Sequence, residues 1–264
     1  MKPRQLVTRP LRALLRSIGY DVVPRDLSGQ SPALPGDFTG DDAEDFRLAA
    51  PYTMVPPERI YTLVRAVEYV VKHDVPGALV ECGTWKGGCA MTMARALERL
   101  GATDRELHLF DLFGEMWPAA TEHDVHLGIP EQERSAHITD VPENMRYTVD
   151  EVRRRVLATG YPGERVHFAK GRVEQTIPEQ APDEIALLRL DTDFYESTRY
   201  ELMHLYPRLA EGGVLIIDDY GDWEGSRKAT DEYIEQHDLP LHLIRVDVGA
   251  RMAVKPHSGE SDNG

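Results

Sequence analysis

The sequence predicts an α/β fold, in which a doubly wound, mostly parallel sheet carries helices on its faces. From Pro56 onward, short apolar runs alternate with longer stretches in which apolar residues recur at helical spacing. The chain's 264 residues are also enough to bury a sizeable core without disulfide or metal staples. Strands that alternate with helices require crossover connections, and crossovers join parallel strands.

The composition excludes several classes of protein. With 41% hydrophobic and 28% charged residues, the chain is neither collagen-like nor wholly disordered. Its 2 cysteines, Cys82 and Cys89, lie in one short segment, which argues against a secreted disulfide framework. No apolar run approaches the roughly 18 residues of a membrane-spanning helix, and the start lacks the apolar core of a signal peptide. We therefore expect a reduced, cytoplasmic protein without a transmembrane segment.

The charge is large, negative and unevenly distributed. A formal net charge of -15 repels phosphate backbones at long range, which argues against nucleic acid as the main partner. Residues 4–18 nevertheless form a predicted basic amphipathic helix with a short apolar face. We favour an arm that docks on its own domain or on a neighbouring subunit of a homo-oligomer. A weak contact with a membrane surface is the alternative.

A compositional change marks the predicted domain boundary. Residues 24–51 are rich in Pro, Gly, Ser and Asp and include the acidic stretch 41–45. This composition predicts a linker or mobile cover rather than a packed element. The predicted organisation is a basic helix and mobile linker over 1–50, followed by an α/β domain over 51–264.

The α/β domain begins with a helix that opens at Pro57 and carries an apolar stripe through Val71. A short apolar run at 78–81 predicts the first strand. A glycine-rich turn follows at 83–88, and helical spacing then returns through Leu97.

The rest of the domain alternates in the same way. Further apolar runs predict strands that end at Asp111, Phe168, Asp191 and Asp219. Helical segments lie near 148–158, 196–209 and 226–237. Residues 241–247 and 250–254 alternate apolar and polar side chains, which is consistent with final strands in an antiparallel pair. The stretch 112–147 has little periodicity and predicts a lid insertion over the sheet edge where open α/β sheets bind ligands.

The glycine-rich turn lies where the first strand passes into a helix. Glycines there let the backbone approach a ligand, and the helix N-terminus presents free N–H groups. The spacing is not G-x-G-x-x-G, and it is not a Walker A loop because Lys86 is not followed by Ser or Thr. Asp111 ends the next strand, where a carboxylate suits the two hydroxyls of a ribose. A tight turn and a solvated acid are the alternative, but together the two features favour a ligand that carries a nucleoside.

The pattern E-x-G-x-x-x-G after the first strand, with an acid at the end of the second, resembles class I S-adenosylmethionine-dependent methyltransferases. That resemblance implies a seven-stranded, Rossmann-like sheet. It also implies that Glu81 lies near the methionine part of the cofactor and that Asp111 holds its ribose. The turn residues implied to line the cofactor are Gly83, Thr84 and Gly87.

Carboxylates also end two later strands. Asp191 ends one, and Asp218 and Asp219 end the strand that follows one helix later. A crossover of this length commonly places its two strands side by side, about 4.8 Å apart, so these acids converge at the carboxyl edge. A divalent cation relieves their mutual repulsion, and hard oxygen ligands favour Mg²⁺. The alternative is that some of them pair with arginines or cap helices, as Asp193 suits a helix that starts near Tyr195.

Four segments together closely resemble the macrocin O-methyltransferase family, namely residues 80–88, 188–198, 205–209 and 212–221. Members of this family methylate sugar hydroxyls with S-adenosylmethionine and Mg²⁺, which implies a small-molecule glycosylated acceptor as the partner. The resemblance implies Asp191, Asp218 and Asp219 as metal ligands, and Asp193 or Asp191 as the proton acceptor. The further cofactor contacts that it implies are Thr53, Met54, Thr148, Gly171 and Arg172.

The chain departs from the antibiotic-pathway members in its first turn, ECGTWKGG, and in the DLF that follows the second strand. The insertion 112–147 has little that aligns, so the chemistry is better specified than the acceptor. We expect the acidic and histidine residues at 122–126 and 137 to form a solvated loop that contacts the acceptor, with His123 as the candidate for that contact.

Two other functions fit parts of the sequence. The segment 191–193, DTD, matches the D-x-D motif of metal-dependent glycosyltransferases, although the glycine-rich turn is not of the kind that forms a nucleotide-sugar pocket. A non-catalytic cofactor-binding protein is the second alternative, and the intact carboxylates argue against it.

Overall fold

The computed structural model describes residues 34–257. The chain divides into a short unit that ends at Asp37 and a larger unit from Phe38 onward, and the larger unit carries the fold. The predicted basic helix of residues 4–18 lies outside the described residues. None of the helices in the described part has the length and hydropathy that a membrane span needs.

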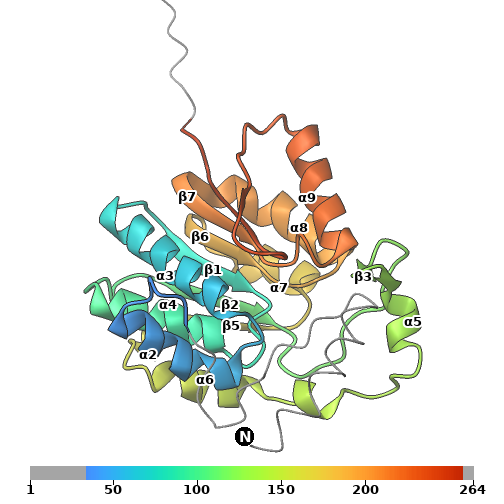
Figure 1. Cartoon of the computed structure of the whole chain (residues 1–264), viewed down its shortest axis with the longest axis horizontal. Helices are drawn as coiled ribbons and strands as arrows, with labels where there is room; N and C mark the ends of the chain where they lie inside the picture. Colours follow the sequence, from blue (N-terminus) through green and yellow to red (C-terminus); the bar gives the residue numbers. More distant parts are fainter. Residues whose placement is uncertain (1–33, 258–264) are drawn as a thin grey trace, which may run out of the picture. The chain divides into compact units, whose positions relative to one another are not determined.

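A seven-stranded sheet forms the centre of the larger unit, in the order β5-β2-β1-β6-β7-β9-β8 (Figure 1). Its strands are β1 (Ala78–Cys82), β2 (Leu107–Asp111), β5 (Val166–Lys170), β6 (Ile185–Leu190), β7 (Leu209–Ile217), β8 (Ile244–Arg245) and β9 (Arg251–Val254). β5, β2, β1, β6 and β7 are parallel, whereas β9 is antiparallel to both β7 and β8. The doubly wound, mostly parallel sheet and its antiparallel final pair are therefore confirmed.

Helices cover both faces of the sheet (Figure 1). One face carries α2 (Gly40–Ala49), α3 (Pro57–Lys72), α4 (Gly88–Arg99) and α6 (Val149–Leu157), and the other carries α7 (Val173–Gln180), α8 (Tyr195–Leu205) and α9 (Glu224–Gln236). Short 3-10 turns lie at Ala50–Tyr52, Glu143–Met145, Gly163–Arg165 and Tyr206–Arg208. Because both faces are covered, every residue of β1 and β6 is buried, as central parallel strands require.

The acidic stretch that the composition assigned to a mobile linker is a packed helix, so that prediction is wrong for residues 40–49. Thr39 begins α2 with a capping box, in which its hydroxyl and the Asp42 carboxylate each accept from the other's backbone N–H. Asp42 and Asp45 are each only 1% exposed. Asp42 pairs with Arg65 of α3, and Asp45 pairs with Arg95 of α4 at 2.8 Å. The basic partners lie on helices far along the chain, which local composition does not reveal.

The insertion between β2 and α6 has structure of its own. It contains a small hairpin of β3 (Val125–His126) and β4 (Ile129–Pro130), followed by the short helix α5 (Glu131–Ser135). A single β-bridge joins His126 to Trp223, just before α9. The insertion is thereby attached beside the carboxyl end of β7.

Candidate active site

The site lies where the strand order of the sheet reverses direction. β1 is flanked by β2 on one side and β6 on the other, and ligands of open α/β sheets bind at the carboxyl edge of such a point. The backbone N–H of Asp191 donates to Cys82 O at 2.9 Å, and that of Asp218 donates to Leu190 O at 2.9 Å. These bonds continue the ladder one residue past each strand, so the first acid after β6 and the first after β7 are held in register.

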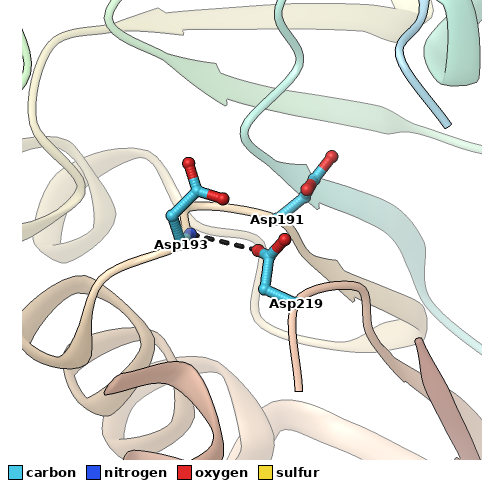
Figure 2. Close-up of side chains that lie close together, drawn as sticks. All are labelled: Asp191, Asp193 and Asp219. Atoms are coloured by element: carbon cyan, nitrogen blue, oxygen red, sulfur yellow. Dashed lines mark hydrogen bonds between the residues drawn. The ribbon is translucent and has the colours of Figure 1, made fainter. Parts of the chain in front are cut away.

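Three carboxylates meet at this edge. Asp191, Asp193 and Asp219 each offer an oxygen, and these oxygens lie within 4.8 Å of one another (Figure 2). The backbone N–H of Asp193 donates to Asp219 Oδ2 at 3.1 Å. Asp193 has a φ of 67°, in the left-handed region that side chains other than glycine adopt at a cost. We refer to these three residues as the acidic cluster.

Asp218, implied as a metal ligand by the family resemblance, lies outside the acidic cluster. Its Oδ2 is 2.5 Å from Arg59 Nη1, and its Oδ1 is 2.8 Å from Arg189 Nη2. Asp218 and Asp219 follow the end of β7 in a bend and both line the smaller cavity, but the carboxylate oxygens that converge are those of Asp191, Asp193 and Asp219. In this structure Asp193 occupies the third position in the cluster instead.

The cluster carries negative charge in a poorly solvated place. Burial and the nearby carboxylates raise the pKa of Asp191 and Asp219 well above the ordinary value, although Arg189 opposes the shift. Burial and Asp191 raise the pKa of Asp193 to about 8. Without a cation, the ionised form of these carboxylates is disfavoured. A divalent cation such as Mg²⁺ fits such a cluster of hard oxygen donors, because it favours the charged form of all three.

A buried ion pair underlies the cluster. Glu81 of β1 is 0% exposed, and its Oε1 accepts from Arg189 Nη1 at 2.9 Å. Its Oε2 is buried without a hydrogen-bond partner among the described residues, and burial raises the pKa of Glu81 to about 7. Glu81 lines neither cavity of the site, so this structure makes it a partner of Arg189 rather than a wall of the cofactor pocket.

Two adjoining cavities open at the sheet edge. The larger, of about 380 Å³, reaches from Asp111 to the acidic cluster, and the smaller, of about 290 Å³, lies between the cluster and Arg59. Their walls have in common Met54, Gly83, Trp85, Asp191, Asp193 and Trp223. The acidic cluster therefore borders two cavities. The larger one extends to Asp111, and the smaller one extends to Arg59.

Asp111 is surrounded by donors. Its carboxylate accepts from Trp85 N at 2.8 Å, from Phe113 N at 2.5 Å and from the Tyr147 hydroxyl at 2.9 Å. Burial raises the pKa of Asp111, and these donors oppose the rise because they stabilise the ionised form. An oriented carboxylate at this position can accept from a ribose diol.

The predicted cofactor residues divide into those that line a cavity and those that do not. The larger cavity is lined by Met54, Gly83, Asp111, Gly171 and Arg172, and the smaller one also by Thr53 and Thr84. Gly87 and Thr148 line neither. A Cβ on Gly87 would come within 2.9 Å of Val152 Cγ1, so this glycine serves the packing of α4 on α6. Thr148 caps α6 through a capping box with Glu151.

Other residues of the site were missed from the sequence. Arg59 and Trp223 line the smaller cavity, and Tyr147 holds Asp111, but none belongs to a spacing pattern that would identify it. His123, the expected acceptor contact, lines neither cavity. Its ring lies against that of Tyr195, with the ring centroids 4.7 Å apart.

Comparisons with known proteins point to one family of enzymes. The family described as Macrocin-O-methyltransferase (TylF) matches residues 32–253. The "Demethyldecarbamoylnovobiocin O-methyltransferase" of Streptomyces niveus is 32% identical over 74% of this chain and 72% of its own. A Streptomyces olivaceus relative, "8-demethyl-8-(2,3-dimethoxy-alpha-L-rhamnosyl)-tetracenomycin-C 4'-O-methyltransferase", is 29% identical over 89% of this chain and 88% of its own. The solved structure "Structure of the O-methyltransferase NovP" has a TM-score of 0.68 at 32% identity, covering 78% of this chain and 82% of that one.

Proposed function

The chain belongs to the macrocin O-methyltransferase family and is an S-adenosylmethionine-dependent O-methyltransferase, and on that premise we propose that it methylates a sugar hydroxyl with the help of Mg²⁺. The observation that carries the proposal is the convergence of three carboxylates within 4.8 Å, beside a cavity that also reaches Asp111. Membership of this family rules out the alternative function as a D-x-D glycosyltransferase. Because the relatives are named O-methyltransferases, it also rules out the alternative function as a non-catalytic cofactor-binding protein.

A sugar-bearing small molecule is the proposed acceptor. The rhamnosyl group in the name of the Streptomyces olivaceus relative supports it. So does the wall of the larger cavity next to the cluster, where Phe194 and Trp223 pack edge to face at 5.5 Å. Aromatic rings of this kind offer apolar faces to the C–H faces of a sugar ring and exclude water.

We assign the metal to Asp191, Asp193 and Asp219, because their carboxylate oxygens converge, whereas Asp218 pairs with Arg59 as well as with the Arg189 that it shares with Asp191. When bound, Mg²⁺ supplies a Lewis acid for an acceptor hydroxyl, and S-adenosylmethionine supplies an electrophilic methyl group. Asp111 accepts hydrogen bonds from the ribose and fixes that end of the cofactor. The chain thereby positions both reactants, which is a large part of the acceleration in a direct transfer.

Asp193 is the proposed proton acceptor, with Asp191 as the alternative. Asp193 lies in the wall of the larger cavity, next to the aromatic residues of the proposed acceptor wall. Asp193 lies in the turn before α8 and immediately precedes Phe194, which forms part of the proposed acceptor wall. The base and the acceptor surface are thus set by the same turn.

The proposed location is the cytoplasm. Both cysteines are free and buried, which suits a reducing compartment.

The test is methyl transfer from labelled S-adenosylmethionine to a panel of glycosylated acceptors, with Mg²⁺ or with EDTA. The variants are Asp191→Asn and Asp219→Asn. Asp140→Asn is the matched control, because Asp140 is exposed and pairs only at the surface with Arg146. We expect transfer that EDTA abolishes and that both cluster variants lose. Full transfer in EDTA, or by either cluster variant, would overturn the role of the metal.

A further inference from the structure

Glu201 is a buried acid that the proposed chemistry does not use. It lies in α8 and is 0% exposed. Its Oε1 accepts from the Thr192 hydroxyl at 2.9 Å, whereas its Oε2 is buried without a hydrogen-bond partner among residues 34–257. Burial raises the pKa of Glu201 to about 8. An acid in this position costs free energy that an apolar side chain of similar size would not.

The one partner of Glu201 lies between two members of the acidic cluster. Thr192 joins Asp191 to Asp193, and its hydroxyl is directed at α8 while the two carboxylates on either side meet Asp219. Its carbonyl accepts from Phe194 N at 2.7 Å and from Ser197 Oγ at 3.3 Å. The turn is therefore tied to the first turns of α8 through both the backbone and the side chain of Thr192.

This turn needs such restraint. Asp193 has a φ of 67°, in the left-handed region that a residue other than glycine adopts at a cost in free energy. The cluster also brings together carboxylates that repel one another, which favours opening of the turn. The hydrogen bond from Asp193 N–H to Asp219 Oδ2, at 3.1 Å, is one restraint that keeps the turn in this conformation. The Thr192–Glu201 hydrogen bond is a second restraint, and it ties the turn to α8.

We propose that Thr192 and Glu201 form a positioning pair, which holds the 191–193 turn in the conformation that presents Asp191 and Asp193 together to a cation. This role rests on the proposed use of the acidic cluster as a Mg²⁺ site. Neither residue is a ligand. The pair determines how many carboxylates one ion meets at once, and hence the affinity of the site.

The test measures Mg²⁺ affinity by calorimetry, in the presence of S-adenosylhomocysteine. Thr192→Val and Glu201→Met keep the volume of each side chain but remove the hydrogen bond. We expect each to raise the Kd for Mg²⁺ by about 10-fold or more, the range for partners that orient metal ligands. Thr192→Ser and Glu201→Gln keep a donor and an acceptor, so we expect both to restore the affinity to within about 3-fold of the wild type.

Controls separate positioning from loss of fold. Thr230→Val removes a buried hydroxyl, bonded at 2.8 Å to Ser226 O within α9, and should leave Mg²⁺ affinity unchanged. S-adenosylhomocysteine affinity reports the Asp111 half of the site and should be unchanged in the Glu201 variants, because Glu201 lines neither cavity, whereas Thr192 lines the larger one. In a double variant of Thr192→Val and Glu201→Met, the second change should add nothing, because both remove the same bond.

A second readout needs no metal. The Asp193 amide should exchange its hydrogen at least about 10-fold faster in Thr192→Val than in the wild type, and Glu201→Gln should keep it slow. If folded Thr192→Val or Glu201→Met binds Mg²⁺ as the wild type does and exchange is unaltered, the positioning pair is refuted. If the wild type itself shows no Mg²⁺ binding that depends on Asp191, the proposed metal site is wrong, and exchange alone decides whether the pair holds the turn.

Discussion

The two ends of the ligand-binding edge treat their carboxylates differently. At the β2 end, Asp111 is a single half-buried acid that accepts from Trp85 N, Phe113 N and the Tyr147 hydroxyl. At the β6 and β7 ends, three carboxylates lie within 4.8 Å and raise one another's pKa. The first arrangement is stable in the chain alone, because donors balance the charge. The second is only partly neutralised, because Arg189 pairs with Asp191 at 2.8 Å, and a cation or protons stabilise it further.

This difference separates preorganisation from ligand dependence within one pocket. The Asp111 half already has the orientation that a ribose needs, and binding costs it little rearrangement. The acidic half has a left-handed residue, Asp193, and needs restraint from the Thr192–Glu201 bond. Substitutions in the two halves should therefore have opposite effects on metal-free stability and separable effects on binding.

The largest expected effect is on catalysis. Asp219→Asn should reduce Mg²⁺-dependent methyl transfer by at least about 100-fold, because loss of a ligand should exceed the loss of a partner that orients one. Affinity for S-adenosylhomocysteine should be unchanged, since Asp219 does not line the larger cavity. Steady-state kinetics and calorimetry measure the two quantities. A parallel loss of cofactor affinity would break the separation of the halves.

Asp111→Asn should show the converse pattern. The amide cannot accept from all the donors that now surround the carboxylate, and a charge-assisted bond to the ribose is lost. We expect the Kd for S-adenosylhomocysteine to rise by roughly 10- to 100-fold, with the Kd for Mg²⁺ unchanged. Calorimetry with each ligand in turn is the measurement. An equal loss of Mg²⁺ affinity would mean that the halves are coupled.

The stability of the metal-free protein should rise in Asp193→Asn. The pKa of Asp193 is raised to about 8, so the folded state holds this proton more tightly than the unfolded chain does. The free energy of unfolding therefore falls as pH rises from about 4 to about 8, and an uncharged Asn removes that contribution. We expect the variant to be about 1–2 kcal/mol more stable than the wild type at pH 8.5, with no difference below pH 4.

Denaturant titrations in EDTA across this pH range measure the difference, with Asp140→Asn as an exposed control. Added Mg²⁺ should stabilise the wild type and leave Asp193→Asn little changed. A destabilised Asp193→Asn at pH 8.5 would mean that the cluster is not under repulsion.

The smallest expected effect is that of Tyr147→Phe. Asp111 keeps its two backbone donors, so loss of one hydroxyl should lower the free energy of unfolding by only about 1 kcal/mol. The loss should persist at all Mg²⁺ concentrations, because this half does not depend on the cation. Urea unfolding with and without Mg²⁺ checks it, and a loss that appears only with Mg²⁺ would contradict the comparison.

Regular periodicity made most of the fold predictable. The alternation from Pro56 onward predicted α3, β1, α4 and the later strands, because parallel strands buried on both faces are continuous apolar runs. α7 was not predicted, since it is only 8 residues long and contains Pro178. α2 was missed because its acidic residues are neutralised by arginines of other helices, and local sequence carries no signal of that pairing.

The site was predictable where strand ends determine it and unpredictable where side-chain direction does. Asp191 and Asp219 follow adjacent strands, so their convergence follows from topology. Whether Asp218 or Asp193 joins them depends on a left-handed φ and on Arg59, which lies in α3. The aperiodic insertion 112–147 gave no basis for predicting which of its residues reach the cavity.

The most direct test of the account is a crystal structure of the full chain with S-adenosylhomocysteine and Mn²⁺ in place of Mg²⁺, with anomalous scattering to locate the ion. The account predicts a single strong peak coordinated by carboxylate oxygens of Asp191, Asp193 and Asp219, with Asp218 still paired to Arg59. A peak coordinated by Asp218 and not by Asp193, or no peak beside the three carboxylates, would contradict it.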